Sequence, residues 1–205
     1  MIKLVVSGSR YSFYLLFIMV IPILFETEYV LTLWLRNVPE YTVVFVQLSL
    51  IYMLCQSLSN TLFTAMLATG NIRNYQIVVG GLALMAFPLS YALFKMGFAP
   101  SYCYYISIFI SVSCLIARLV MLQRMIGLPM RIFLKDVVLR VLFVSILSLV
   151  IPCLIINLMP QGFVRLMVLS FVSLMTISIV ILYIGITKNE RVFLITYIKN
   201  KIHKK

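Results

Sequence analysis

Polar residues recur at helical spacing within two otherwise apolar stretches of the sequence. In the stretch 41–68 they are three or four positions apart, and they are Ser49, Tyr52, Gln56, Asn60 and Thr64. In the stretch 102–125 the same spacing gives Tyr104, Ser107, Ser111, Cys114 and Arg118. At about 100° per residue, the first set falls within an arc of about 120° on a helix. Each set therefore forms a polar stripe along one helix face.

Two interpretations of these stripes stay open. Polar groups are costly against lipid chains, so each stripe is expected to face protein or water. One interpretation is helix–helix packing through small residues and amide hydrogen bonds. The other is the wall of a hydrated substrate cavity, in which Gln56, Asn60, Ser107 and Ser111 would supply amides and hydroxyls.

Arg118 is the deepest basic residue, about two turns from the end of its apolar stretch. A long arginine side chain at that depth can extend to the nearer headgroups. It can also offer a planar, bidentate fork to a phosphate group inside a cavity. Both roles fit the sequence.

Acidic and metal-binding groups are few. Glu26 and Glu28 follow the first apolar stretch, where they would be solvated or ion-paired, or would couple transport to a proton or an ion. The four cysteines lie inside apolar stretches without a CxxC pair, and the single histidine, His203, lies in a lysine-rich tail. We expect no metal site, no cofactor and no enzymatic activity.

The composition requires a lipid environment for most of the chain. Hydrophobic residues make up 63% of the 205 residues and charged residues 11%, against roughly 25% charged in soluble domains. The net charge of +12 comes from groups at the ends of apolar stretches and in the tail, which argues against nucleic acid as a partner.

Six apolar stretches approach the roughly 20 residues that a membrane-spanning helix needs. They cover residues 11–25, 41–68, 75–96, 102–125, 132–159 and 163–186. The first is short, so it must extend toward Val5 or continue past Glu28. Pro22, Pro88 and Pro152 are expected to bend their helices. The sequence thus predicts an all-α integral membrane protein, a six-helix transmembrane bundle over residues 1–187.

Basic residues predict the orientation of this bundle. With the amino terminus in the cytoplasm, only Arg36, Lys95 and Arg165 of the 17 lysines and arginines lie outside, and the other 14 lie inside. Tyr11 and Tyr75 then belong to the inner aromatic belt. Both termini are predicted to be cytoplasmic. The basic tail 188–205 would form either an interfacial amphipathic helix or a frayed segment that only enforces topology.

Two passages of running sequence are similar to a known family. The stretch 25–36 (FETEYVLTLWLR), followed by Val38 to Glu40, and the stretch 68–81 (ATGNIRNYQIVVGG), continued at 87–91 (FPLSY), carry the likeness. They resemble bacterial polysaccharide and O-antigen flippases of the Wzx type, in the multidrug/oligosaccharidyl-lipid/polysaccharide exporter superfamily. The resemblance extends over most of the chain and is strongest from residue 10 to residue 100.

The resemblance implies a function and a missing partner. Family members have two helical lobes around a central cavity, and this chain resembles the second lobe, beginning one helix late. We therefore expect part of a multi-pass flippase of the bacterial inner membrane, active in polysaccharide or lipopolysaccharide biosynthesis. Its partners would be membrane lipids, the undecaprenyl-pyrophosphate-linked oligosaccharide and the amino-terminal lobe. Arg118, with Arg10 or Arg140, would attract the pyrophosphate, and the polar stripes would line the cavity beside the sugars.

Three other classes remain as alternatives. A membrane-embedded polysaccharide polymerase or glycosyltransferase would need a larger outer loop with acidic and arginine residues. A multidrug exporter would share the fold, but the quoted passages resemble the polysaccharide branch more closely. A membrane scaffold would not need aligned polar stripes.

Overall fold

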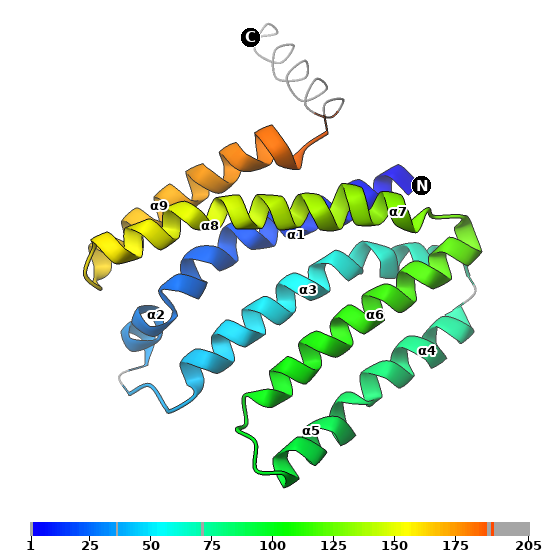
Figure 1. Ribbon diagram of the computed structural model, residues 1–205, viewed down its shortest axis with the longest axis horizontal. Coiled ribbons are helices and arrows are strands. Elements are labelled where there is room, and N and C mark those ends of the chain that lie inside the picture. Colours follow the sequence, from blue (N-terminus) through cyan, green and yellow to red (C-terminus); the bar gives the residue numbers. More distant parts are fainter. Residues whose placement is uncertain (1, 36, 71, 188–189, 191–205) are drawn as a thin grey trace, which may run out of the picture. The chain divides into compact units, whose positions relative to one another are not determined.

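Helices account for the regular structure of the chain. The computed structural model describes residues 2–35, 37–70, 72–187 and 190, and no strand occurs among them. The α-helices are α1 (Ile2–Phe25), α2 (Thr27–Trp34), α3 (Thr42–Ala68), α4 (Ile72–Leu84), α5 (Ala86–Lys95), α6 (Tyr102–Ile126), α7 (Met130–Phe133), α8 (Arg140–Leu158) and α9 (Phe163–Val180) (Figure 1). Two π-helical segments, η1 (Leu134–Leu139) and η2 (Ile181–Gly185), extend α7 and α9.

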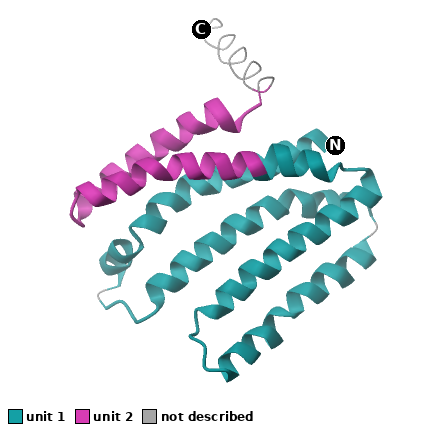
Figure 2. Cartoon of the chain, viewed as in Figure 1, with its two compact units in different colours: residues 1–138 teal, residues 139–205 magenta. Residues whose placement is uncertain are grey.

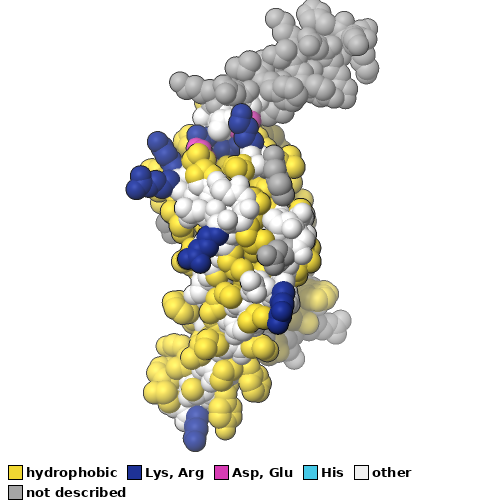
Figure 3. All heavy atoms as spheres, turned by 90° about the vertical axis from the view of Figure 1, so that its right-hand side faces the viewer, with side chains coloured by type: hydrophobic (Ala, Val, Ile, Leu, Met, Phe, Trp, Pro, Cys, Tyr) yellow, Lys and Arg dark blue, Asp and Glu magenta, His cyan; other side chains and the backbone are white. Residues whose placement is uncertain are grey.

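Six helical segments of the described chain are long and apolar enough to cross a membrane. Three are the single helices α1, α3 and α6. The other three are composite, and they run over Ile72–Lys95, Met130–Leu158 and Phe163–Gly185. The predicted all-α fold with six spans is therefore confirmed, and it is the architecture of a multi-pass membrane protein. Hydrophobic side chains, yellow in Figure 3, are most frequent in the lower part of the face shown, and many large hydrophobic side chains are exposed, as lipid contact requires.

The first span extends toward the amino terminus beyond the apolar stretch 11–25, as the shortness of that stretch predicted. It begins at Ile2, contains Pro22 and ends at Phe25, and α2 resumes the helical path after one intervening residue. The hydroxyl of Thr27 donates to the carbonyl of Leu24 (3.0 Å), and the side-chain amide of Gln47 donates to the same carbonyl (3.3 Å). Side chains thus satisfy backbone groups at the break, as an apolar setting demands.

The third span breaks where proline predicted a bend. Helix α4 ends at Leu84 and α5 begins at Ala86, because Pro88 has no N–H to donate to the carbonyl of Leu84. The hydroxyl of Ser90 donates to the carbonyl of Ala86 (2.7 Å) in the following turn. Helix α8, in contrast, continues through Pro152.

The chain divides into two compact units, and the boundary lies between residues 138 and 139 (Figure 2). This boundary falls inside the fifth span, at the π-helical segment η1, and the single bundle to residue 187 stays a prediction. In unit 1 (Met1–Val138), α3 packs against α1 on one side and α6 on another, and α4 and α5 pack on α6. In unit 2 (Leu139–Lys205), α8 and α9 pack together. Except for Glu190, the predicted tail 188–205 lies outside the described residues.

Candidate functional site

A small cavity lies inside unit 1, where α3, the α4–α5 span and α6 meet. Its volume is about 120 Å³, room for about four water molecules at about 30 Å³ each. Ten residues line it, and they are Tyr52, Gln56, Val79, Ala83, Ala86, Ser107, Ile110, Ser111, Cys114 and Arg118. The structure therefore brings together parts of both polar stripes, one from α3 and one from α6.

Arg118 is held at this cavity by aromatic residues from two other helices. Its Nε donates to the hydroxyl of Tyr75 on α4 (3.1 Å), and Tyr75 is itself buried. The guanidinium carbon lies 5.9 Å from the Tyr75 ring centre and 6.0 Å from that of Phe63 on α3, within the range of cation–π attraction. No carboxylate in the described part of the chain pairs with Arg118. Nη1 and Nη2 are consequently left for an anion.

Ser111 offers the cavity an unsatisfied hydroxyl. Its side chain is 3% exposed, and its Oγ has no hydrogen-bond partner among the described residues. A buried polar group without a partner costs about 1–3 kcal/mol. Water or a ligand oxygen in the cavity would remove that cost.

Two further cavity side chains are already partly engaged. The amide nitrogen of Gln56 donates to the hydroxyl of Tyr52 one turn earlier (2.7 Å), which leaves the amide oxygen of Gln56 to accept from a ligand. The hydroxyl of Ser107 donates to the carbonyl of Cys103 in its own helix (2.8 Å) and retains acceptor capacity. The cavity therefore presents a cationic end at Arg118 and neutral hydrogen-bonding groups beside it.

Asn60, predicted as a cavity residue, does not line this cavity. It is exposed on α3, and its carbonyl accepts from the hydroxyl of Thr64 (3.1 Å). The reason is helical drift, since residues four apart differ by about 40°. The stripe on α3 therefore turns away from α6 between Gln56 and Thr64.

Arg10 and Arg140 are not among the cavity residues. Arg10 on α1 is 1% exposed, and its Nη1 donates to the carbonyl of Asp136 in η1 (3.5 Å). Its guanidinium carbon lies 5.4 Å from the ring centre of Tyr11. Arg10 thus holds α1 to η1 within unit 1. Arg140 is half-buried at the start of α8 in unit 2.

Glu26 and Glu28 lie where α1 gives way to α2. Glu26 is 1% exposed, whereas Glu28 is exposed in the first turn of α2. Both have further interactions within the chain, so neither is an isolated charge. Their role in ion coupling stays a prediction. No three His, Cys, Asp or Glu residues gather as a metal-binding group in the described part.

Phe63 and Tyr75 are site residues that the sequence did not indicate. Tyr75 was predicted to belong to the inner aromatic belt, but it is 2% exposed and holds Arg118. An aromatic residue at a span end has the same sequence signature in both roles. Only the approach of α4 to α6 distinguishes them.

No protein-family model, curated protein or solved structure matches the chain. The family resemblance therefore stays a prediction from the sequence.

Proposed function

We propose that the chain is part of a flippase that moves an undecaprenyl-pyrophosphate-linked oligosaccharide across the bacterial inner membrane. The observation that carries this proposal is the position of Arg118, which lines a polar cavity among apolar spans. This arginine has no carboxylate partner in the described chain. The distribution of basic residues supports the orientation, with both termini in the cytoplasm.

The chemistry of the cavity suits the phosphate end of such a lipid. A guanidinium binds phosphate oxygens through two parallel hydrogen bonds. The low dielectric between apolar helices strengthens this attraction relative to water. The rings of Phe63 and Tyr75 fix the guanidinium plane in advance, so less side-chain entropy is lost on binding.

The size of the cavity limits what this chain can hold by itself. A volume of about 120 Å³ accepts a phosphate group but not an oligosaccharide. The sugars would extend beyond the cavity into space that this part of the protein does not enclose. That geometry fits a chain that works with the amino-terminal lobe implied by the family resemblance.

The test is complementation of a flippase-deficient bacterium by the protein as its gene encodes it. Surface glycan is scored against membrane abundance. We expect Arg118→Gln to lower glycan at least ten-fold at unchanged abundance, Arg118→Lys to retain part of it, and Arg118→Glu to abolish it. Arg124→Gln is the matched control, because Arg124 is exposed in the last turn of the same helix. Normal glycan from Arg118→Gln would remove Arg118 from the transport site.

A further inference from the structure

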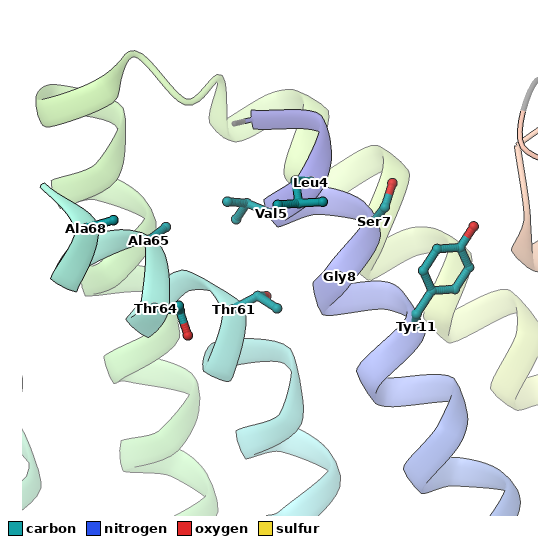
Figure 4. A pocket seen from close by; sticks show the side chains of 9 residues that line it. All are labelled: Leu4, Val5, Ser7, Gly8, Tyr11, Thr61, Thr64, Ala65 and Ala68. Carbon is teal, nitrogen blue, oxygen red and sulfur yellow. The ribbon is translucent and has the colours of Figure 1, made fainter.

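A second, larger depression lies between α1 and α3 of unit 1. Its volume is about 450 Å³, and its lining comes from Leu4, Val5, Ser7, Gly8, Tyr11, Thr61, Thr64, Ala65 and Ala68. It follows about two turns of each helix, from Leu4 to Tyr11 and from Thr61 to Ala68, a length of about 10 Å at 1.5 Å per residue. Figure 4 shows Val5 and Thr61 in the space between the two helices. We call this depression the α1–α3 groove.

The polar atoms around the groove are mostly satisfied within the protein. The hydroxyl of Thr61 hydrogen-bonds that of Ser9, and the hydroxyl of Thr64 donates to the carbonyl of Asn60 (3.1 Å). Ser7 also has an interaction within the chain. The remaining lining is aliphatic, glycine or alanine apart from Tyr11. A hydrocarbon chain fits this surface, because it has no hydrogen-bonding groups of its own and leaves the hydrogen bonds of the groove residues intact.

The volume fits one hydrocarbon chain better than a helix. Two turns of helix, about 10 Å wide with its side chains and about 10 Å long, occupy roughly 800 Å³. The groove holds little more than half of that.

Two basic residues flank in sequence the end of the groove that Leu4 and Ala68 line, which the predicted orientation places near the cytoplasmic surface. Lys3 is exposed just before Leu4, and Arg73 is exposed in the first turn of α4, five residues after Ala68. The segments 2–11 and 61–73 contain no aspartate or glutamate. The deeper end is bounded by Tyr11, whose ring lies against the Arg10 guanidinium. An occupant would therefore have an anionic head beside Lys3 and Arg73 and an apolar chain directed inward.

We propose that the α1–α3 groove binds one acyl chain of an anionic membrane phospholipid, whose headgroup lies at Lys3 and Arg73. Basic side chains at the ends of spans attract anionic headgroups. The proposal is independent of the flippase proposal, because it uses neither Arg118 nor the cavity. It assigns a lipid site to a face of α3 that would otherwise be ordinary lipid contact.

The test uses the purified protein in bilayers that contain phosphatidylglycerol with a photoreactive group in its acyl chain. Cross-linked residues are located by mass spectrometry. We expect labelling to concentrate on residues 2–11 and 61–68, at least three-fold above the same probe with a phosphatidylcholine headgroup. Lys3→Gln combined with Arg73→Gln should remove that preference.

Variants that fill the groove provide the second arm. Ala68 and Thr64 line the groove but are exposed, so Ala68→Phe and Thr64→Leu should fold normally and lower labelling about five-fold. The matched control is Ala92→Phe, the same change at an exposed site on α5. Equal labelling on all spans, or labelling unaffected by both filling variants, would each overturn the proposal.

Discussion

Helix α3 has a polar cavity on one side and the apolar α1–α3 groove on the other. Gln56, at the cavity, and Thr64, at the groove, belong to the same polar stripe, yet eight residues of drift separate them by about 80°. The hydroxyl of Thr64 is satisfied by its own helix, whereas Gln56 retains a free acceptor and Ser111 opposite it has no described partner. Polar residues in a membrane helix therefore indicate a site only where their hydrogen bonds are left incomplete.

The largest effect is expected at the close approach of α1 and α3. A Cβ built at Gly8 would lie 2.9 Å from Cγ2 of Thr61, whose hydroxyl is fixed by Ser9. Gly8→Val should therefore lower the free energy of unfolding by about 1–3 kcal/mol, the usual cost of overpacking. Thermal unfolding of the detergent-solubilised protein measures this. In the control Gly81→Val, where no atom lies within 4 Å of the new Cβ, the change should stay within about 0.5 kcal/mol. Equal losses at both glycines would mean that α1 and α3 are not in close contact.

A smaller effect distinguishes binding from packing along α3 itself. Gln56→Leu should leave membrane abundance unchanged and lower glycan export three- to ten-fold, because it removes a hydrogen-bonding group from the cavity. Gln47→Leu is the matched change at another position of α3, where the side-chain amide donates a hydrogen bond to the carbonyl of Leu24 near the end of α1. It should lower abundance and export in parallel. If Gln56→Leu also lowered both in parallel, packing would explain the stripe better than binding.

The sequence was sufficient for the membrane helices because their signal is local. Length and apolarity decide a span, so all six were identified, and Pro88 indicated the break in the third. The apolar stretch 11–25 marks only part of the first span, since Lys3 and Arg10 interrupt the apolar pattern although Arg10 is buried against η1. A charge that pairs within the protein has the same sequence signature as one at the membrane surface.

The site could be predicted only in part, because it depends on which helices meet. Periodicity placed Gln56, Ser107, Ser111 and Arg118 on two faces, and the packing of α3 on α6 brings those faces together. Asn60 fits the same periodicity but lies outside the cavity. The hydrogen bond between Arg118 and Tyr75 joins residues 43 positions apart, so no local sequence pattern predicts it.

The most direct measurement of the central claim uses Cys114, which lines the cavity one turn before Arg118. With Cys55, Cys103 and Cys153 replaced by alanine, modification of Cys114 by methyl methanethiosulfonate is followed by intact mass. Undecaprenyl pyrophosphate should slow this modification at least three-fold, and undecaprenol, which has the same tail without the charge, should not. The protection should disappear in Arg118→Gln. Equal protection by undecaprenol, or protection that persists in Arg118→Gln, would contradict a phosphate site at Arg118.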